Sequence, residues 1–508
     1  MAWTTLPERV GTQAEQRPDA PALLWHGQEI GYAELSGLAG TARRGLEALG
    51  LPGEGPVALV AKKSPQAVAV LLACLALRQP VLIPSAELGE ETLGELLARA
   101  GAPCLPSPLA LTDQAAHPGL VLGEPAGTEG SGCPALPEDT TFLLTTSGST
   151  GLPKAVPVSA AALDRFTAWA GQRFGIGPGS TVLNYAPLNF DLCLLDIWTT
   201  LASGGCAALV DQDLAVNPAH LLQQFQARPV QVVQGVPMLF QLLGQAERLS
   251  RGDEFAQVEH VLLTGDAISA KGLGALPGLF PKARLHNVYG CTETNDSFVH
   301  EIDPAVDPGR YGSVPIGSPV TGADALVLDE EGAVLTGAGR GELMVRTPFQ
   351  SAGYLDPALD DGVFVPHPGG GSAEPGATGR WYRTGDLVRR HPDGTLTLEG
   401  RRDFVVKVRG VRINTAEVEE ALRRHPEVAD AAVLALPDER AGKRLHAVVQ
   451  RTGHSALNGL QLREHAAKLL PRVAIPSKVD LVDTALPRTP TGKLDRKAVL
   501  GRLHGQSA

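Results

Sequence analysis

Residues 145–155 (TTSGSTGLPKA) combine small hydroxyl side chains, glycines and one lysine. Glycines let a backbone approach a ligand closely, hydroxyl groups donate hydrogen bonds, and Lys154 adds a compact positive charge. This combination suits a loop that wraps the oxygens of a polyphosphate. The loop is not a Walker A loop, because no Gly-Lys-Ser/Thr follows the glycines at the required spacing. A flexible Gly/Ser surface turn is the alternative that the segment leaves open by itself.

Four further segments carry residue types that fit the same chemistry. They are 287–296 (NVYGCTETND), 379–390 (GRWYRTGDLVRR), 399–413 (EGRRDFVVKVRGVRI) and 486–499 (LPRTPTGKLDRKAV). In the first of them, Tyr289 offers a ring face for stacking on a purine. Glu293 offers a hard oxygen ligand suited to Mg²⁺, and Thr292 and Thr294 can donate to a phosphate. A polar turn that caps a helix would not require this ring, these hydroxyls and this carboxylate together.

The order and spacing of the five segments resemble the adenylate-forming superfamily, which comprises acyl-CoA synthetases, luciferases and the adenylation domains of nonribosomal peptide synthesis. The resemblance covers about residues 20–500. It implies an AMP-forming ligase that uses ATP and Mg²⁺. The residues that it assigns to cofactor binding are Thr145, Ser147, Gly148, Ser149, Thr150, Gly151, Lys154, Gly265, Asp266, Ala267, Asn287, Tyr289, Gly290, Thr292, Thr294, Asp386 and Arg401.

The resemblance also implies a catalytic set of Lys493, Thr146 and Glu293, with Glu293 as the metal ligand. Lys493, in PTGKLDR, matches the lysine that reaches the substrate carboxylate and the α-phosphate, where its ammonium would offset charge in the transition state. Asp386, in RTGD, matches the carboxylate that accepts hydrogen bonds from the ribose hydroxyls. Taken alone, a Thr-Gly-Asp sequence is more often only a turn, and a lysine near a terminus is more often solvated. Ala155 departs from the family, in which many members carry glycine, and predicts a stiffer exit from the loop.

Residues 184–205 bear on which acid is activated. Asp191 stands where amino-acid-activating members carry an aspartate for the α-ammonium, although an aspartate that caps the following helix is the alternative. A carboxylate in apolar surroundings is costly unless a cation pairs with it, and a substrate ammonium would supply that cation. Matching by motif gives the other pocket positions: Leu192, Leu195, Gln234, Leu262, Thr264, Val288, Asp296 and Ser297.

The stretch FDLCLLDIWTTL resembles stand-alone prolyl-activating enzymes, so a small or cyclic amino acid, proline first, is the expected substrate. The polar residues Gln234, Thr264, Asp296 and Ser297 depart from that pattern. Asp296 can pair with a cationic or hydroxylated side chain if it faces the pocket, and a polar or cationic amino acid is therefore the alternative. If Asp296 points to solvent, a proline-sized pocket remains.

Relatives finish by moving the acyl group to the thiol of a phosphopantetheine arm. The nearest match to a carrier-domain serine is Ser455, which a polar loop explains better, and 508 residues leave no room for a condensation or carrier domain. The expected acceptor is therefore phosphopantetheine on a separate carrier protein, in natural-product biosynthesis. An acyl- or aryl-CoA ligase is a competing interpretation, and a non-catalytic homologue is a third. Retention of Lys154, Glu293, Asp386 and Lys493 together argues against the third.

Composition restricts the partners and the compartment. The net charge is −11, which disfavours a nucleic-acid partner held by bulk charge. The six cysteines show neither metal-ligand spacing nor a disulfide framework, so we expect them to be reduced and mostly buried. The first residues do not resemble a signal peptide, and no apolar run is long enough to span a membrane. A cytoplasmic enzyme without a membrane partner is the expectation.

Two stretches of the chain alternate short apolar runs with helical periodicity, residues 20–110 and 140–300, which predicts α/β sheet subdomains. The pattern of residues 310–400 is more typical of β structure, with a surface loop expected over 363–379 and another over 101–139. A small α+β unit is expected from about residue 403, with a helix that begins near Asn414. The predicted fold is thus a large α/β domain with a β-rich subdomain, residues 1–402, and a small C-terminal domain, residues 403–508. The resemblance places the hinge between them at Asp403.

Overall fold

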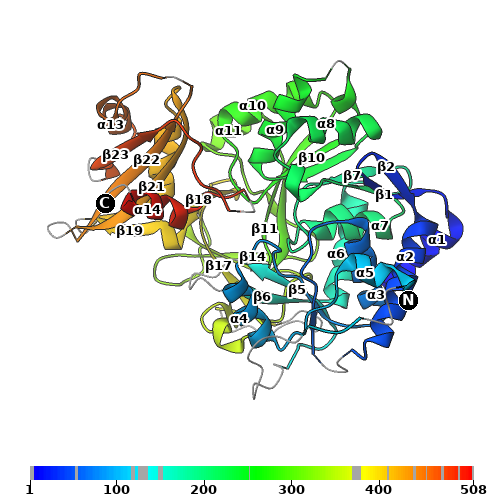
Figure 1. Ribbon diagram of the computed structural model, residues 1–508. Helices are drawn as coiled ribbons and strands as arrows, with labels where there is room; N and C mark the ends of the chain where they lie inside the picture. Colours follow the sequence, from blue (N-terminus) through cyan, green and yellow to red (C-terminus); the bar gives the residue numbers. More distant parts are fainter. Residues whose placement is uncertain are drawn as a thin grey trace. The chain divides into compact units, whose positions relative to one another are not determined.

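A computed structural model of the chain (Figure 1) describes residues 5–51, 55–115, 120–123, 135–146, 153–250, 252–368, 379–408, 411–438, 442–453, 455–470, 474–489 and 492–505. The chain divides into two compact units. The first comprises Met1–Ala325 and Val345–Arg383, and the second comprises Leu326–Met344 and Thr384–Ala508. Each unit is described by itself below.

A nine-stranded sheet forms the centre of the first unit, in the order β13-β12-β11-β10-β9-β7-β8-β1-β2. Its strands are β1 (Pro21–Trp25), β2 (Gln28–Gly31), β7 (Thr181–Asn184), β8 (Cys206–Leu209), β9 (Val232–Gly235), β10 (His260–Thr264), β11 (Arg284–Cys291), β12 (Asn295–Glu301) and β13 (Ser318–Pro319). The strands from β1 through β8, β7, β9 and β10 to β11 pair in parallel, whereas β2, β12 and β13 add antiparallel edges. The alternating strands and helices predicted the parallel centre, and the antiparallel edges were not predicted.

Helices cover both faces of this sheet. Side chains of alternate parity, such as Val182 and Leu183, enter two separate hydrophobic cores. The first core packs against α1 (Leu6–Gln16), α2 (Tyr32–Ala48), α3 (Pro65–Ala76), α5 (Pro108–Thr112), α6 (Ala160–Arg173), the π-helix η2 (Leu194–Thr199) and α7 (Thr200–Ala202). The second packs against α8 (Pro218–Ala227), α9 (Pro237–Glu247), α10 (Ala270–Leu279) and the 3₁₀ helix η4 (Glu254–Gln257). Such coverage is expected for parallel strands that are buried on both faces.

A second sheet of the first unit, in the order β3-β4-β5-β6, carries both ends of the glycine-rich loop. Its strands are β3 (Val57–Ala58), β4 (Val81–Leu82), β5 (Thr140–Thr146) and β6 (Lys154–Ser159), and α4 (Glu90–Ala100) packs against it. Strands β5 and β6 are antiparallel, with Thr146 opposite Lys154. The loop is therefore the connection of a hairpin, and the register brings its two ends together.

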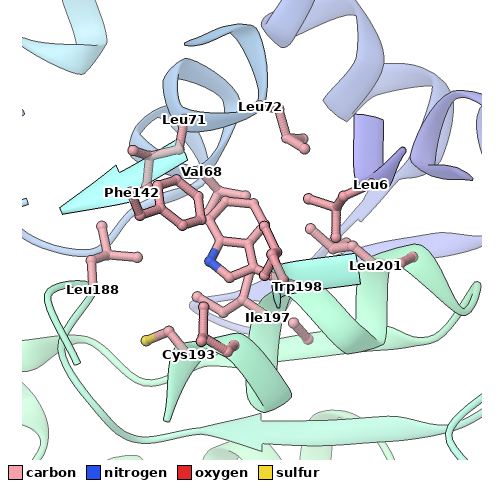
Figure 2. Close-up of a cluster of buried hydrophobic side chains, with 14 of the residues drawn as sticks. Leu6, Val68, Leu71, Leu72, Phe142, Leu188, Cys193, Ile197, Trp198 and Leu201 are labelled. Atoms are coloured by element: carbon pink, nitrogen blue, oxygen red, sulfur yellow. The ribbon is translucent and has the colours of Figure 1, made fainter. Parts of the chain in front are cut away.

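The first core includes residues of both sheets, around Trp198 of η2, whose side chain is only 2% exposed. Figure 2 shows its indole among Phe142 of β5, Val68 and Leu71 of α3, and Leu6 of α1. The rings of Phe142 and Trp198 have their centroids 5.4 Å apart. This packing fixes η2 against the sheet, and η2 follows directly after the turn that carries Asp191.

The chain passes from the first unit into the second within strands β14 (Asp324–Leu328), β15 (Gly339–Arg346) and β17 (Trp381–Arg390). In the first unit β16 (Phe364–Val365) pairs with the beginning of β17, and in the second unit β18 (Leu396–Arg401) pairs with the rest of it. The remaining elements of the second unit are the 3₁₀ helix η6 (Arg402–Phe404), β19 (Val405–Val408), β20 (Val411–Asn414), α12 (Thr415–Arg423), β21 (Val428–Asp438), β22 (Gly442–Arg451), α13 (Gly459–Ala467), β23 (Lys478–Val482) and α14 (Arg496–Gly505). Helix α12 begins as predicted, because Asn414 accepts a hydrogen bond from the amide of Ala416. The short elements η3 (Gln212–Leu214), α11 (Asp307–Tyr311) and η5 (Pro357–Asp360) complete the first unit.

Several sequence expectations need adjustment. Residues 363–379 are not all loop, since β16 forms an edge strand there, and α5 interrupts the loop that was expected over 101–139. Among the described cysteines, Cys74, Cys193 and Cys206 are buried and Cys104 and Cys291 are half-buried. No helix within the described ranges combines the length and the apolar character that a membrane span requires.

Two histidines form a buried pair on adjacent strands of the large sheet. His260 Nδ1 and His286 Nε2 lie 3.0 Å apart, and the rings stack with centroids 5.2 Å apart. Burial lowers the pKa of His260 to about 4 and that of His286 to about 3, and the positive charges of Arg284 and Arg173 add to the effect. Both imidazoles are therefore neutral in the folded chain at neutral pH.

This pair predicts a loss of stability in acid. Below about pH 6.5 the unfolded chain protonates both histidines while the folded chain does not, so the free energy of unfolding should fall as the pH drops from about 6.5 to about 4. Each histidine contributes at most about 1.4 kcal/mol per pH unit. Urea unfolding between about pH 7.5 and 5 measures the slope, which should be shallower in His286→Gln. An unchanged slope in that variant would show that other groups control the acid sensitivity.

Candidate active site

The ends of the glycine-rich loop are the first part of the site. Thr145 and Thr146 close β5 and Lys154 opens β6, while Ser147, Gly148, Ser149, Thr150 and Gly151 lie outside the described residues. Ala155, the departure noted in the sequence, lies in β6 opposite Thr145 and is 7% exposed. Its methyl group belongs to the core of the second sheet, so a β-strand accommodates the residue.

Glu293 lies in the turn between β11 and β12 and is 7% exposed. Its Oε1 accepts a hydrogen bond of 2.7 Å from the hydroxyl of Tyr354. The Nζ atom of Lys154 lies 4.5 Å from the centroid of the same tyrosine ring. Lys154 and Glu293 were predicted from separate motifs, and the structure brings one to the ring and the other to the hydroxyl of the same tyrosine. The sequence analysis did not identify Tyr354.

The hairpin of β11 and β12 fixes the other residues of the YGCTETN motif. Gly290 faces Asp296 across the two strands, and a Cβ atom there would collide with the carbonyl oxygen of Asn295. The ring of Tyr289 is half-buried and packs edge-on against Phe298, with centroids 5.7 Å apart. The hydroxyl of Thr294 is buried and bonds Ser297 at 2.9 Å, and Thr292 is half-buried. Thr294 therefore supports the turn in this structure, whereas Thr292 is more accessible.

The other nucleotide-binding candidates of the first unit follow the neighbouring strand ends. Gly265 follows β10 with a φ of 78°, which favours glycine. Asp266 is exposed, and its Oδ1 accepts from the amide of Ala267 at 2.8 Å. Asn287 of β11 donates to the carbonyl oxygen of Pro315 at 2.7 Å. These residues lie at the carboxyl ends of parallel strands, where open α/β sheets commonly bind ligands.

The predicted amino-acid pocket collects on one face of the large sheet. Gln234 of β9, Leu262 and Thr264 of β10 and Val288 of β11 share the parity that faces η2. Leu195 lies within η2, and Asp191 and Leu192 form the half-buried turn before it. Asp296 and Ser297 follow at the start of β12, with exposures of 9% and 0%. The structure thus brings all nine predicted pocket residues to η2 and the sheet face beneath it.

Asp296 is buried and does not point to solvent. Burial, together with the negative charge of Asp191, raises the pKa of Asp296 to about 8. No hydrogen bond from another side chain reaches its carboxylate within the described part of the chain. The negative charge of Asp191 therefore reaches the buried carboxyl group of Asp296.

A buried polar cluster lies behind this pocket, and the sequence analysis missed it. The Nζ atom of Lys63 donates to the carbonyl oxygens of Asn184, Tyr185 and Ala186 at 2.9, 3.2 and 3.0 Å. Asp196 of η2 is fully buried and accepts from Asn184 Nδ2 at 3.2 Å. Burial lowers the pKa of Lys63 to about 8 and raises that of Asp196 well above its usual value. The cluster links the end of β7 to the residue before the N-cap of α3 and to η2. No local pattern in the sequence predicts it.

The second unit holds the remaining predicted residues. Asp386 of β17 is 8% exposed and lies opposite Arg401 of β18, whose Nη1 donates to Asp386 Oδ1 at 3.2 Å. Gly385, with a φ of 70°, bends the chain directly before it. Asp403 lies within η6. The structure thus pairs the two predicted nucleotide-binding residues of this unit with each other on neighbouring strands.

Lys493 lies in a tight turn of the second unit and is exposed. Its carbonyl oxygen accepts from the amide of Thr489 at 2.7 Å, and Gly492 has a φ of 79°. Arg488 secures the turn by donating to the carbonyl oxygen of Gly492 at 2.7 Å and by an ion pair with Asp430. These bonds hold Thr489 and Gly492 beside Lys493, whose side chain is exposed to solvent.

The donor set suits magnesium that arrives with a nucleotide. The described residues contain no group of three metal-ligating side chains. Glu293 Oε1 is held by Tyr354, and no hydrogen bond from a described residue reaches Oε2. Mg²⁺ usually takes one or two carboxylates together with phosphate oxygens and water, so one available carboxylate oxygen fits MgATP better than a dedicated metal cage.

Comparison with known proteins identifies the family of the chain. Residues 10–355 match the family described as AMP-binding enzyme, and residues 417–493 match the AMP-binding enzyme C-terminal domain. The chain is 35% identical over 370 residues to an L-proline–(L-prolyl-carrier protein) ligase of Pseudomonas fluorescens, covering 73% of this chain and 70% of that protein. It is 27% identical to a D-alanine–D-alanyl carrier protein ligase of Bacillus licheniformis, over 97% of this chain and 98% of that one.

Solved structures and longer relatives complete the comparison. The structure of Klebsiella oxytoca NpsA in complex with 3-hydroxyanthranilyl-AMSN matches with a TM-score of 0.79 at 25% identity, over 99% of both chains. The chain is also 32% identical to a dimodular nonribosomal peptide synthase of Bacillus subtilis, of which it spans only 21%. The predicted mixed α/β fold with a large and a small domain is confirmed by these structural matches. The chain belongs to the AMP-binding enzyme family, the adenylate-forming ligases.

Proposed function

We propose that the protein adenylates an amino acid and transfers the aminoacyl group to the phosphopantetheine thiol of a separate carrier protein. The observation that carries this proposal is the electrostatic interaction between two carboxyl groups, those of Asp191 and Asp296, beside apolar pocket residues. A ligand that brings a positive charge would offset the repulsion between these two groups, and an α-ammonium is such a charge. Coenzyme A ligases of simple acyl or aryl acids have no need of it. The named functions of the carrier-protein ligase relatives support the same acceptor.

In the first half-reaction an oxygen of the amino-acid carboxylate forms a bond to the α-phosphorus of ATP, and the bond from that phosphorus to the pyrophosphate oxygen breaks. Asp191 would orient the amino acid through its ammonium, and Lys493 would offset charge as the carboxylate approaches phosphorus. Asp386 would hold the ribose hydroxyls, with Arg401 beside it. Glu293 would hold Mg²⁺, which when bound neutralises phosphate charge.

In the second half-reaction the thiol sulfur of the carrier forms a bond to the acyl carbon, and the bond from that carbon to the AMP oxygen breaks. The family resemblance suggests that residues 403–508 reorient about Asp403 between the two steps. This motion would withdraw Lys493 and present the backbone of residues 403–413 to the pantetheine arm. Gly410, the residue expected to let the arm pass, lies outside the described residues.

Two kinds of amino acid remain candidates for the substrate. Proline is the first, because the relatives at 35% and 34% identity are both named as L-proline ligases. A polar or cationic amino acid is the second, and the burial of Asp296 favours it. Because Asp296 lacks a cation from the described residues, a substrate with a second hydrogen-bond donor would reduce the free-energy cost of burying its carboxyl group.

Amino-acid-dependent exchange of pyrophosphate into ATP tests the proposal. We expect exchange with one member or a narrow group of a panel that holds the twenty amino acids, ornithine, β-alanine and matched acids without the amine. Removal of the amine should abolish it. Preference for proline over ornithine would identify a cyclic substrate, and the reverse would show that Asp296 selects a cationic one. Exchange only with acids that lack the amine would refute the proposal in favour of a CoA ligase.

A further inference from the structure

The segment that carries Tyr354 is bonded to both predicted phosphate-site motifs. The amide of Ser351 donates to the carbonyl oxygen of Glu293 at 2.8 Å, and the amide of Leu355 donates to the carbonyl oxygen of Ala155 at 3.0 Å. Tyr354 therefore lies between two backbone anchors, one beside the metal-ligand candidate and one beside the loop lysine. The three sections of chain are far apart in sequence, so this arrangement is a product of the tertiary fold.

The turn before Tyr354 is held from its other side as well. The carboxylate of Asp360 accepts a hydrogen bond of 2.8 Å from the amide of Tyr354, and it forms an ion pair of 2.9 Å with Arg380. A Cβ atom on Gly353 would collide with the same carboxylate, so a larger residue there would displace Asp360. Asp360 and Arg380 thus help to fix the backbone that presents the tyrosine.

The Tyr354 side chain makes a separate interaction at each of its parts. Its hydroxyl donates to Glu293 Oε1 at 2.7 Å and accepts from the hydroxyl of Tyr382. Phe364 packs against both tyrosine rings, with centroid distances of 5.5 Å to Tyr354 and 5.1 Å to Tyr382. The face of the Tyr354 ring lies 4.5 Å from the Lys154 ammonium. One buried side chain therefore orients an anion with its hydroxyl and a cation with its ring.

We propose that Tyr354 is a positioning residue that sets Glu293 and Lys154 for MgATP, with Tyr382 supporting its hydroxyl. Because Tyr354 occupies Glu293 Oε1, Oε2 is the oxygen left for the metal ion, and the carboxylate cannot rotate freely. The ring holds the Lys154 ammonium beside it at the start of β6. This inference rests on the proposed function, since it concerns the nucleotide part of the same site.

The two roles of Tyr354 can be separated by substitution. Tyr354→Phe removes the hydroxyl and keeps the ring, whereas Tyr354→Leu removes both. We expect Tyr354→Phe to lower the apparent affinity for Mg²⁺ in ATP–pyrophosphate exchange by about 10-fold or more, as is typical when the partner of a metal ligand is lost. Tyr354→Leu should in addition weaken nucleotide binding without metal, because Lys154 loses the ring. Tyr382→Phe should lower the apparent affinity for Mg²⁺ as well, but by less than Tyr354→Phe does.

Binding measurements supply a readout that does not depend on activity. Isothermal titration calorimetry with α,β-methylene-ATP, in MgCl₂ and in EDTA, gives the gain in affinity that the metal provides. Tyr354→Phe should reduce this gain by about 10-fold and leave the affinity in EDTA unchanged. Tyr32→Phe is the matched control, because it also removes a buried tyrosine hydroxyl, which bonds Leu201 and Gly205 at 3.0 and 2.8 Å. It should lower thermal stability without changing the gain from metal.

The outcomes separate this inference from the proposed function. If wild-type protein shows amino-acid-dependent exchange while Tyr354→Phe and Tyr382→Phe keep the wild-type gain from Mg²⁺, the positioning role is wrong and the function stands. If both tyrosine variants lose as much as Tyr32→Phe in stability and show no selective effect on metal, the hydroxyls are structural only, which also overturns the inference. If the gain from Mg²⁺ falls as expected but no amino acid supports exchange, Tyr354 positions a nucleotide site of another function.

Discussion

Replacing Lys493 by alanine is expected to lower the rate of adenylate formation by about 100- to 1,000-fold, the loss that follows removal of one group that stabilises transition-state charge. Thioester formation from preformed aminoacyl adenylate should be largely spared, because the lysine acts on the carboxylate and α-phosphate only in the first step. The variant should also keep its fold, since Lys493 is exposed and its loss leaves no buried gap. ATP–pyrophosphate exchange measures the first half-reaction, and thiolation of a carrier or a pantetheine analogue measures the second.

Lys497→Ala is a matched control for this variant. Lys497 is an exposed lysine four positions further along, in α14, and it carries no predicted role. It should retain both half-reactions. Equal loss of the two half-reactions in Lys493→Ala would remove the lysine from adenylation and assign it a general structural role.

Replacing Asp191 by asparagine is expected to raise the KM for the amino acid by about 10- to 150-fold, while the KM for ATP changes little. The estimate follows from the roughly 1.5–3 kcal/mol that a hydrogen bond to a charged group contributes. The variant should also lose discrimination between the amino acid and the same acid without its amine, because the neutral asparagine no longer forms an ion pair with the ammonium. Steady-state exchange kinetics with both compounds measure the two effects.

Asp213→Asn provides the comparison for Asp191→Asn. Asp213 is an exposed aspartate of the same unit, where it pairs with Lys62 at the surface. Its replacement should leave both KM values and the discrimination unchanged. If Asp191→Asn raises the KM for the amino acid and for its amine-free analogue by the same factor, Asp191 shapes the pocket but does not bind the substrate amine.

The local elements were predictable because their patterns are local. The helix expected to begin near Asn414 is α12, and the alternating stretch 140–300 holds strands such as β7, β9 and β10 with helices between them. The order of the strands was not predictable, since β7 lies between β9 and β8 and the edges are antiparallel. Periodicity reports how one element is buried, but the choice of neighbours depends on the packing of both faces of the sheet.

The sequence by itself determined the family, the cofactors and the identity of the candidate site residues, because the five motifs keep residue types that the chemistry requires in a fixed order. Only the tertiary structure decided that Asp296 is buried and that the charge of Asp191 raises its pKa. It also decided that Lys63 and Asp196 form a polar cluster behind the pocket. Tyr354 contacts both Glu293 and Lys154 only because the fold brings these segments together. The physical reason is the same in each case. These interactions join side chains from separate strands and turns, and their strength comes from burial, which no single segment of sequence can show.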